Sequence, residues 1–146
     1  MLTISNETRI LCGIAMICVP AVQVGGLFLL WLIRNNAPGY LDNPLRQAFF
    51  RAGHAHAGVL LILSLISQIL VDSIVIGDPF RWLIRLAIPS AAILMPLGFF
   101  LSVASPQNPR PNSLVGLIYL GALVLALGVL LLGFFLLRAG TVTWFL

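Results

Sequence analysis

The stretch RQAFFRAGHAHAGVLLILSLISQILVD, residues 46–72, decides the fold class. From Gly58 onward it is a mostly apolar run that holds no charged residue before Asp72. About 20 helical residues cross the roughly 30 Å hydrocarbon layer of a bilayer. Because backbone polar groups must be satisfied internally in lipid, the run predicts a transmembrane helix over about 49–76.

Three further apolar segments lie at about 10–33, 82–104 and 113–137. They are separated by turn-rich sequences: RNNAPGYLDNP at 34–44, GDPF at 77–80 and SPQNPRPNS at 105–113. The first segment is longer than a signal-peptide core, so we expect it to be retained as a membrane helix. The pattern predicts an all-α integral membrane protein: one domain over 1–146, an up-down four-transmembrane-helix bundle with both termini on the same side.

Composition agrees with a protein of the bilayer. Hydrophobic residues make up 60% of the 146 residues and charged residues only 8%, against about 25% charged in soluble domains. The net charge of +4 is spread over the loops, which suits lipid head groups and argues against a nucleic-acid partner. Four arginines fall at each end of the predicted bundle, so the positive-inside rule leaves the orientation open.

The fourth segment carries small residues at helical spacing. Gly121 and Gly128 are a heptad apart, and Ala122 and Ala126 are four residues apart. Small residues at such spacing let helices approach closely. These residues therefore predict a packing face, either inside the bundle or between protomers.

The polar residues of the second segment separate into two faces. At 100° per residue, His54, Gln68 and Asp72 share one stripe, whereas His56 looks the opposite way. Unpaired polar groups in lipid are costly, so the stripe should face the other helices. We expect His56 to point toward lipid, interfacial water or a neighbouring chain.

Depth separates the members of this stripe. Asp72 lies 18 residues beyond His54, about 27 Å along a helix axis. It lies near the GDPF turn, where Arg81 and Arg85 are its natural partners. Asp72 is therefore either part of an intramembrane site or the end of the helix, and both interpretations stay open.

In the first segment, Gln23 is deep enough to need a hydrogen-bonding partner. The neighbouring pair Gly25 and Gly26 would permit close packing against it.

The two histidines of the chain are candidate ligands. Neutral imidazole binds metals and haem iron. A histidine at interfacial depth can also have no binding role, because its polar tip can reach water. Both histidines lie on one helix, so a complete site would need a dimer or a partner subunit. We expect no catalytic machinery, because the chain lacks an HExxH motif and a serine–histidine–acid set at shared depth.

The string FFRAGHAHAG, 49–58, follows a first apolar segment and a polar loop. It resembles small, roughly four-helix membrane proteins related to subunit I of haem-copper oxidases. The resemblance implies a haem ligand in the second helix, with Arg51, His54 and His56 at the matching positions. It covers about ten of the 146 residues. Leu60 and Leu61 stand where those proteins favour a Gly-Trp-like step, and no later helix supplies a second histidine.

Two functions are therefore expected ahead of others. The first is an accessory or structural subunit that packs against a larger respiratory or transport complex in a bacterial plasma membrane. The second is a haem- or metal-binding electron-transfer protein that uses His54 or His56, possibly across a dimer interface. A small transporter with Asp72 and Gln23 on its path ranks third, because no internal repeat is visible.

Overall fold

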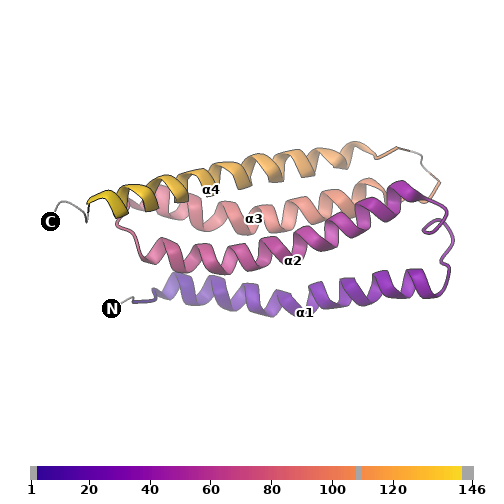
Figure 1. Ribbon diagram of the computed structural model, residues 1–146, viewed down its shortest axis with the longest axis horizontal. Coiled ribbons are helices and arrows are strands. Elements are labelled where there is room, and N and C mark those ends of the chain that lie inside the picture. Colours follow the sequence, from indigo (N-terminus) through magenta and orange to yellow (C-terminus); the bar gives the residue numbers. More distant parts are fainter. Residues whose placement is uncertain (1–2, 108–109, 143–146) are drawn as a thin grey trace.

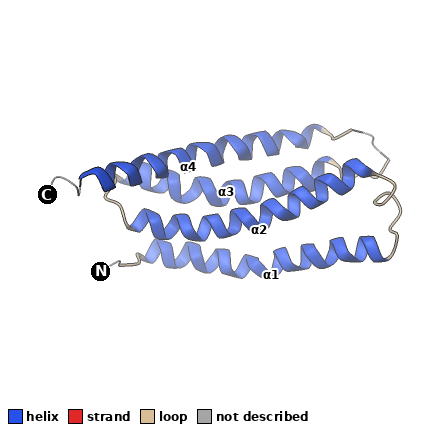
Figure 2. Ribbon diagram, in the orientation of Figure 1, coloured by secondary structure: helices blue, strands red, loops and turns tan. Residues whose placement is uncertain are grey.

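The chain folds into long helices. A computed structural model describes residues 3–107 and 110–142, and no strand occurs in these ranges (Figure 2). The helices are α1 (Asn6–Arg34), α2 (Pro44–Asp72), α3 (Asp78–Ser102) and α4 (Gly116–Val142), with a short 3₁₀ turn, η1 (Ser113–Val115), before α4. Four helices are long and apolar enough to cross a bilayer, which confirms the all-helical prediction with four candidate spans. The expected 105–113 loop includes residues 108 and 109, which lie outside the described residues.

The first three helices begin four or five residues before the predicted boundaries, because their first turns hold polar residues, and those of α1 and α2 are also capped by a side chain. The side chain of Ser5 accepts a hydrogen bond from the Thr8 amide at the start of α1, and Asn43 does the same for Arg46 in α2. Capping side chains satisfy amides that have no partner within a helix, and proline is favoured in the first turn, as at Pro44. Apolar runs therefore mark the spans but not the helix ends.

The second helix ends at Asp72 rather than near 76 as predicted. The chain turns after Ser73, and Ile74 and Ile76 are buried in a cluster with residues of α3 and α4. These two isoleucines extend the apolar run in sequence without extending the helix.

The four helices run alternately up and down, and they lie in an open row from α1 to α4 (Figure 1). Among the described residues, the backbone of α1 approaches only α2, whereas α3 packs along both α2 and α4. In the apolar stretch of α3, 44% of the residues are buried, against 11% in α1. Thus α3 is the central helix and α1 is an edge helix. The start of α1 and the end of α4 lie at the same end of the molecule (Figure 1).

The contact between α3 and α4 depends on glycine. A Cβ atom added at Gly121 would lie 2.6 Å from Cγ of Met95, and one added at Gly128 would lie 2.8 Å from Cβ of Ala87. By contrast, Ala122 and Ala126 are exposed on the outer side of α4. The four small residues expected to form one packing face are therefore divided, and within this chain only the glycines contact α3.

At the end of the molecule that carries the α1–α2 loop, α1 is held by an apolar cluster. Phe50 packs its ring 5.8 Å from that of Tyr40 and 5.1 Å from that of Phe100 of α3. We call this the loop-end cluster; its buried members are Leu29, Leu32, Ala37, Tyr40, Phe50 and Val103.

Candidate functional site

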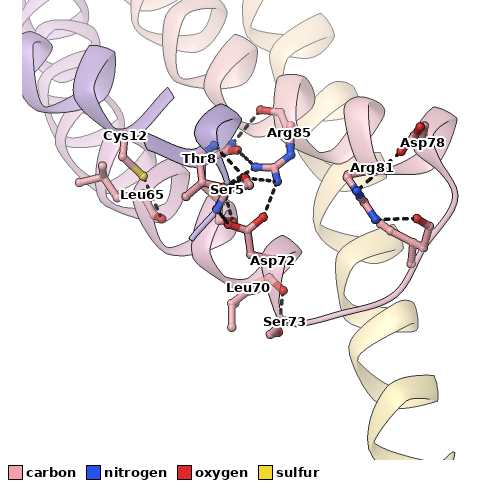
Figure 3. Close-up of polar contacts among 12 residues, drawn as sticks. Ser5, Thr8, Cys12, Leu65, Leu70, Asp72, Ser73, Asp78, Arg81 and Arg85 are labelled. Carbon is pink, nitrogen blue, oxygen red and sulfur yellow. Dashed lines mark hydrogen bonds and ion pairs between the residues drawn. The ribbon is translucent and has the colours of Figure 1, made fainter. Parts of the chain in front are cut away.

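A buried ion pair lies at the opposite end of the molecule, near the start of α1 (Figure 3). Arg85 projects from α3 toward the last residue of α2, Asp72, and its Nη2 lies 2.5 Å from Oδ1 of the carboxylate. Only 2% of the Arg85 side chain and 7% of the Asp72 side chain are exposed. Two charges removed from water in this way must be stabilised by each other and by further hydrogen bonds.

The further hydrogen bonds come from α1, from Ser5 that caps it, and from α2. Arg85 donates from Nη1 to Oγ1 of Thr8 at 2.6 Å and to Oε1 of Gln68 at 2.9 Å. Its Nη2 also donates to Oγ of Ser5 at 3.1 Å. The Ser5 amide donates to Oδ2 of Asp72 at 2.9 Å, and the Gln68 amide donates to the Arg85 carbonyl. We call these five residues the Arg85 network.

The Arg85 network joins three helices and uses nearly all of its own polar atoms. Of the buried side-chain atoms in this network, only Nε of Arg85 has no hydrogen-bond partner in the described part of the chain. A carboxylate and a guanidinium so fully engaged are poorly placed to react with a substrate. The arrangement supports a structural role, fastening the first turns of α1 to α2 and α3.

Sequence reasoning found part of this network. Of the two expected partners, Arg85 pairs with Asp72, whereas Arg81 pairs with Asp78 at 3.6 Å and donates to the Ile76 carbonyl. Ser5 and Thr8 were missed. A serine just before an apolar helix, as at Ser5, is typical of a helix cap. Nothing in the sequence indicates that the hydroxyls of Ser5 and Thr8 also face Arg85.

His54 lies in the seam between α2 and α1. A Cβ added at Gly26 would lie 3.2 Å from both Cε1 and Nε2 of the imidazole, and one added at Gly25 would lie 3.5 Å from Nδ1. The ring thus faces α1, in the direction that the helical wheel predicts. Close packing does occur at this glycine pair, and the side chain packed against it is His54. No hydrogen-bond partner of His54 occurs among residues 3–107 and 110–142.

Gln23 is exposed on α1 and has no hydrogen-bond partner within the described ranges. It borders a groove along the α1–α2 seam, together with Gly26, His54 and Gly58. The partner that the sequence led us to expect for Gln23 is therefore not supplied by the described chain.

His56 points to the side of α2 opposite His54, and on that side α2 packs against α3. Its Nδ1 lies 2.7 Å from the Ala52 carbonyl oxygen, and its ring centre lies 4.9 Å from that of Phe99. His56 thus lies on the face opposite His54, as the helical wheel predicts, but this face meets α3. Its ring is only partly buried, so the rest of its surface is open to lipid, water or another chain.

Arg51 is exposed and donates to Oε1 of Gln47 at 2.6 Å, one turn earlier on α2, rather than to either histidine. His54 and His56 therefore do not converge on one ligand within the chain. In the described ranges, no group of three or more His, Cys, Asp or Glu side chains could hold a metal ion.

A cavity of about 310 Å³ lies between α1, α2 and α3, with His54 and Gln68 both in its wall. It runs between the loop-end cluster and the Arg85 network, where the backbones of α1 and α3 stay apart. Much of its lining is small: Ala15, Ala21, Gly25, Ala57, Ser64 and Ala92. We call this space the lateral slot. Sequence reasoning missed it, because the small residues that form it are scattered over three helices.

No protein-family model, curated protein or solved structure matches this chain.

Proposed function

We propose that this chain is a multi-pass protein of a bacterial plasma membrane, with four crossings, that acts as an accessory subunit of a larger respiratory or transport complex. The four long apolar helices support the membrane location. The engagement of Asp72 and Arg85 with each other supports a role without catalytic machinery of its own.

Gln23 is the observation that carries the proposal of a partner subunit. It lies 17 residues from the start of α1 and 11 from its end, about 26 Å and 17 Å along the axis. Its amide would therefore lie deep in the hydrocarbon layer, where a polar group without a partner is costly. Interhelical hydrogen bonds from Gln side chains hold membrane helices together. The edge helix α1 has a free side on which a helix of another subunit can supply that bond.

A photo-crosslinking residue at Leu27, which borders the same groove, tests this proposal in native membranes. We expect a discrete crosslinked protein band that weakens about tenfold in a Gln23→Leu variant, since such a bond contributes about 1–2 kcal/mol. Val24→Leu, a change of an exposed neighbour, is the matched control and should leave the band unchanged. A band of two copies of this chain would replace the accessory role by self-association. Crosslinks to lipid alone would contradict both.

Haem or metal binding is the second proposal, and the orientation of His56 favours it. A backbone carbonyl bonded to one ring nitrogen fixes the ring and leaves the other nitrogen available, as in many histidine ligands. Because His54 and His56 lie on opposite sides of α2, they do not fit one haem within a single chain. Each ligand would come from a different chain, so the cofactor would lie between two subunits.

The visible spectrum of protein purified in mild detergent tests this second proposal. It predicts a Soret band and a reduced-minus-oxidised α-band, lost on His56→Ala if His56 is the ligand and on His54→Ala if His54 is. A colourless protein, or a spectrum indifferent to both changes, would contradict it.

A further inference from the structure

The lateral slot is long and narrow, and it lies between the loop-end cluster and the Arg85 network. Its walls run from Leu11 to Gly25 on α1 and from His54 to Gln68 on α2, each about 21 Å along the axis. At one end the wall includes Phe100, which packs on Phe50 of the loop-end cluster, and at the other it includes Gln68 of the Arg85 network. Along its side the slot is bordered by the exposed residues Ile14, Cys18 and Ile93. Access is therefore from the side of the helices.

The polar groups of the slot differ in what they can still bind. The Ser64 hydroxyl already donates to the Leu60 carbonyl at 2.7 Å. The Gln68 side chain is engaged at both its oxygen and its nitrogen by Arg85. The His54 imidazole has no partner in the described ranges, and an imidazole offers a donor or an acceptor at each nitrogen. One end of the slot thus presents a free hydrogen-bonding group, and the rest of the wall is almost entirely apolar.

We propose that the lateral slot binds a single-chain, uncharged amphiphile, with its chain along the slot and an oxygen of its head group hydrogen-bonded to His54. The inference rests on the proposed membrane location, because the ligand reaches the side opening from the bilayer.

Shape and charge identify this class of ligand. About 310 Å³ spread over this length holds an extended chain better than a compact ring system, and pockets of about this size that bind ligands are lined mainly by apolar groups with few polar ones. None of the lining residues is an acid or an arginine. A carboxylate or phosphate head group would therefore lack a counter-ion and would be costly to desolvate. A hydroxyl or carbonyl head group needs only the hydrogen bond that His54 offers.

A photoreactive analogue of hexadecanol tests the proposal with the full-length protein in lipid nanodiscs. We expect saturable labelling of the segments around Ala57 and Ala92, suppressed by excess hexadecanol but not by palmitate. Ala92→Leu and Ala57→Leu each fill the slot and should abolish the saturable component. Ala122→Leu, at an exposed alanine of α4, is the matched control and should label as the unmodified protein does. His54→Phe keeps a ring of similar size and should weaken hexadecanol competition about five- to tenfold, as the loss of one hydrogen bond predicts.

The outcomes separate the two proposals. Protein that does not incorporate into nanodiscs contradicts the membrane location. Protein that incorporates but is labelled without saturation, evenly over its outer faces, contradicts the ligand site. Equal competition by hexadecanol and by hexadecane, or no effect of His54→Phe, would overturn the role of His54 and with it the proposed ligand class.

Discussion

Replacing Arg85 by methionine is expected to lower the free energy of unfolding by about 3–5 kcal/mol, the usual cost of leaving a buried charge without its partner. Asp72 would remain buried without a charged partner, with only neutral donors such as the Ser5 amide left to it. Thr8 and Gln68 would also lose the guanidinium that joins α1 to α2 and α3. Equilibrium unfolding in mixed detergent micelles measures the change.

Two variants serve as controls for this prediction. Arg81→Met removes an ion pair whose side chains are 37% and 82% exposed, so it should cost no more than about 1 kcal/mol. Combining Arg85→Met with Asp72→Leu removes both charges and should recover part of the loss, because the unpaired carboxylate disappears. Equal effects of Arg85→Met and Arg81→Met would show that the Arg85 network does not stabilise the fold.

Replacing Gly121 by leucine is expected to cost about 1–3 kcal/mol by overpacking the contact between α3 and α4. The first added carbon would meet both the side chain of Met95 and its backbone nitrogen, the latter at 3.1 Å. A side chain can rotate away, but a backbone atom moves only if the helix moves. The same unfolding assay measures the loss.

Gly133→Leu is the matched control, since a Cβ there meets nothing within 4 Å. Both changes replace glycine by leucine within α4, so the difference between them isolates the packing contact from helix propensity. Equal stability of the two variants would contradict the close approach of α3 and α4 at Gly121.

The four helices could be predicted because their length and apolar composition are visible in any short window of sequence. The 100° rule also placed His54 and Gln68 on the same side of α2, where they line one cavity. What it could not show is which helix meets which face. Lipid is as apolar as leucine, so the hydrophobicity of a residue does not reveal whether it faces a helix or the bilayer.

Three residues illustrate this limit. Ala122 and Gly121 are adjacent small residues, yet only Gly121 lies against α3. His56 was expected on an outer face, and its partly buried ring also packs against Phe99 because the helices form a row with α2 between two neighbours. The row itself depends on interhelix contacts, such as the hydrogen bonds of Arg85 to Thr8, that join positions far apart in sequence.

The side of the membrane from which single cysteines can be labelled, in sealed membrane vesicles, tests the central claim of four membrane crossings most directly. In a chain without Cys12 and Cys18, single cysteines are placed at the exposed positions Thr3, Asp42 and Thr141 and treated with a membrane-impermeant maleimide. The account predicts that Thr3 and Thr141 react from the same side of the membrane and Asp42 only from the other. Opposite sidedness of Thr3 and Thr141, or reaction of all three positions from one side, would contradict it.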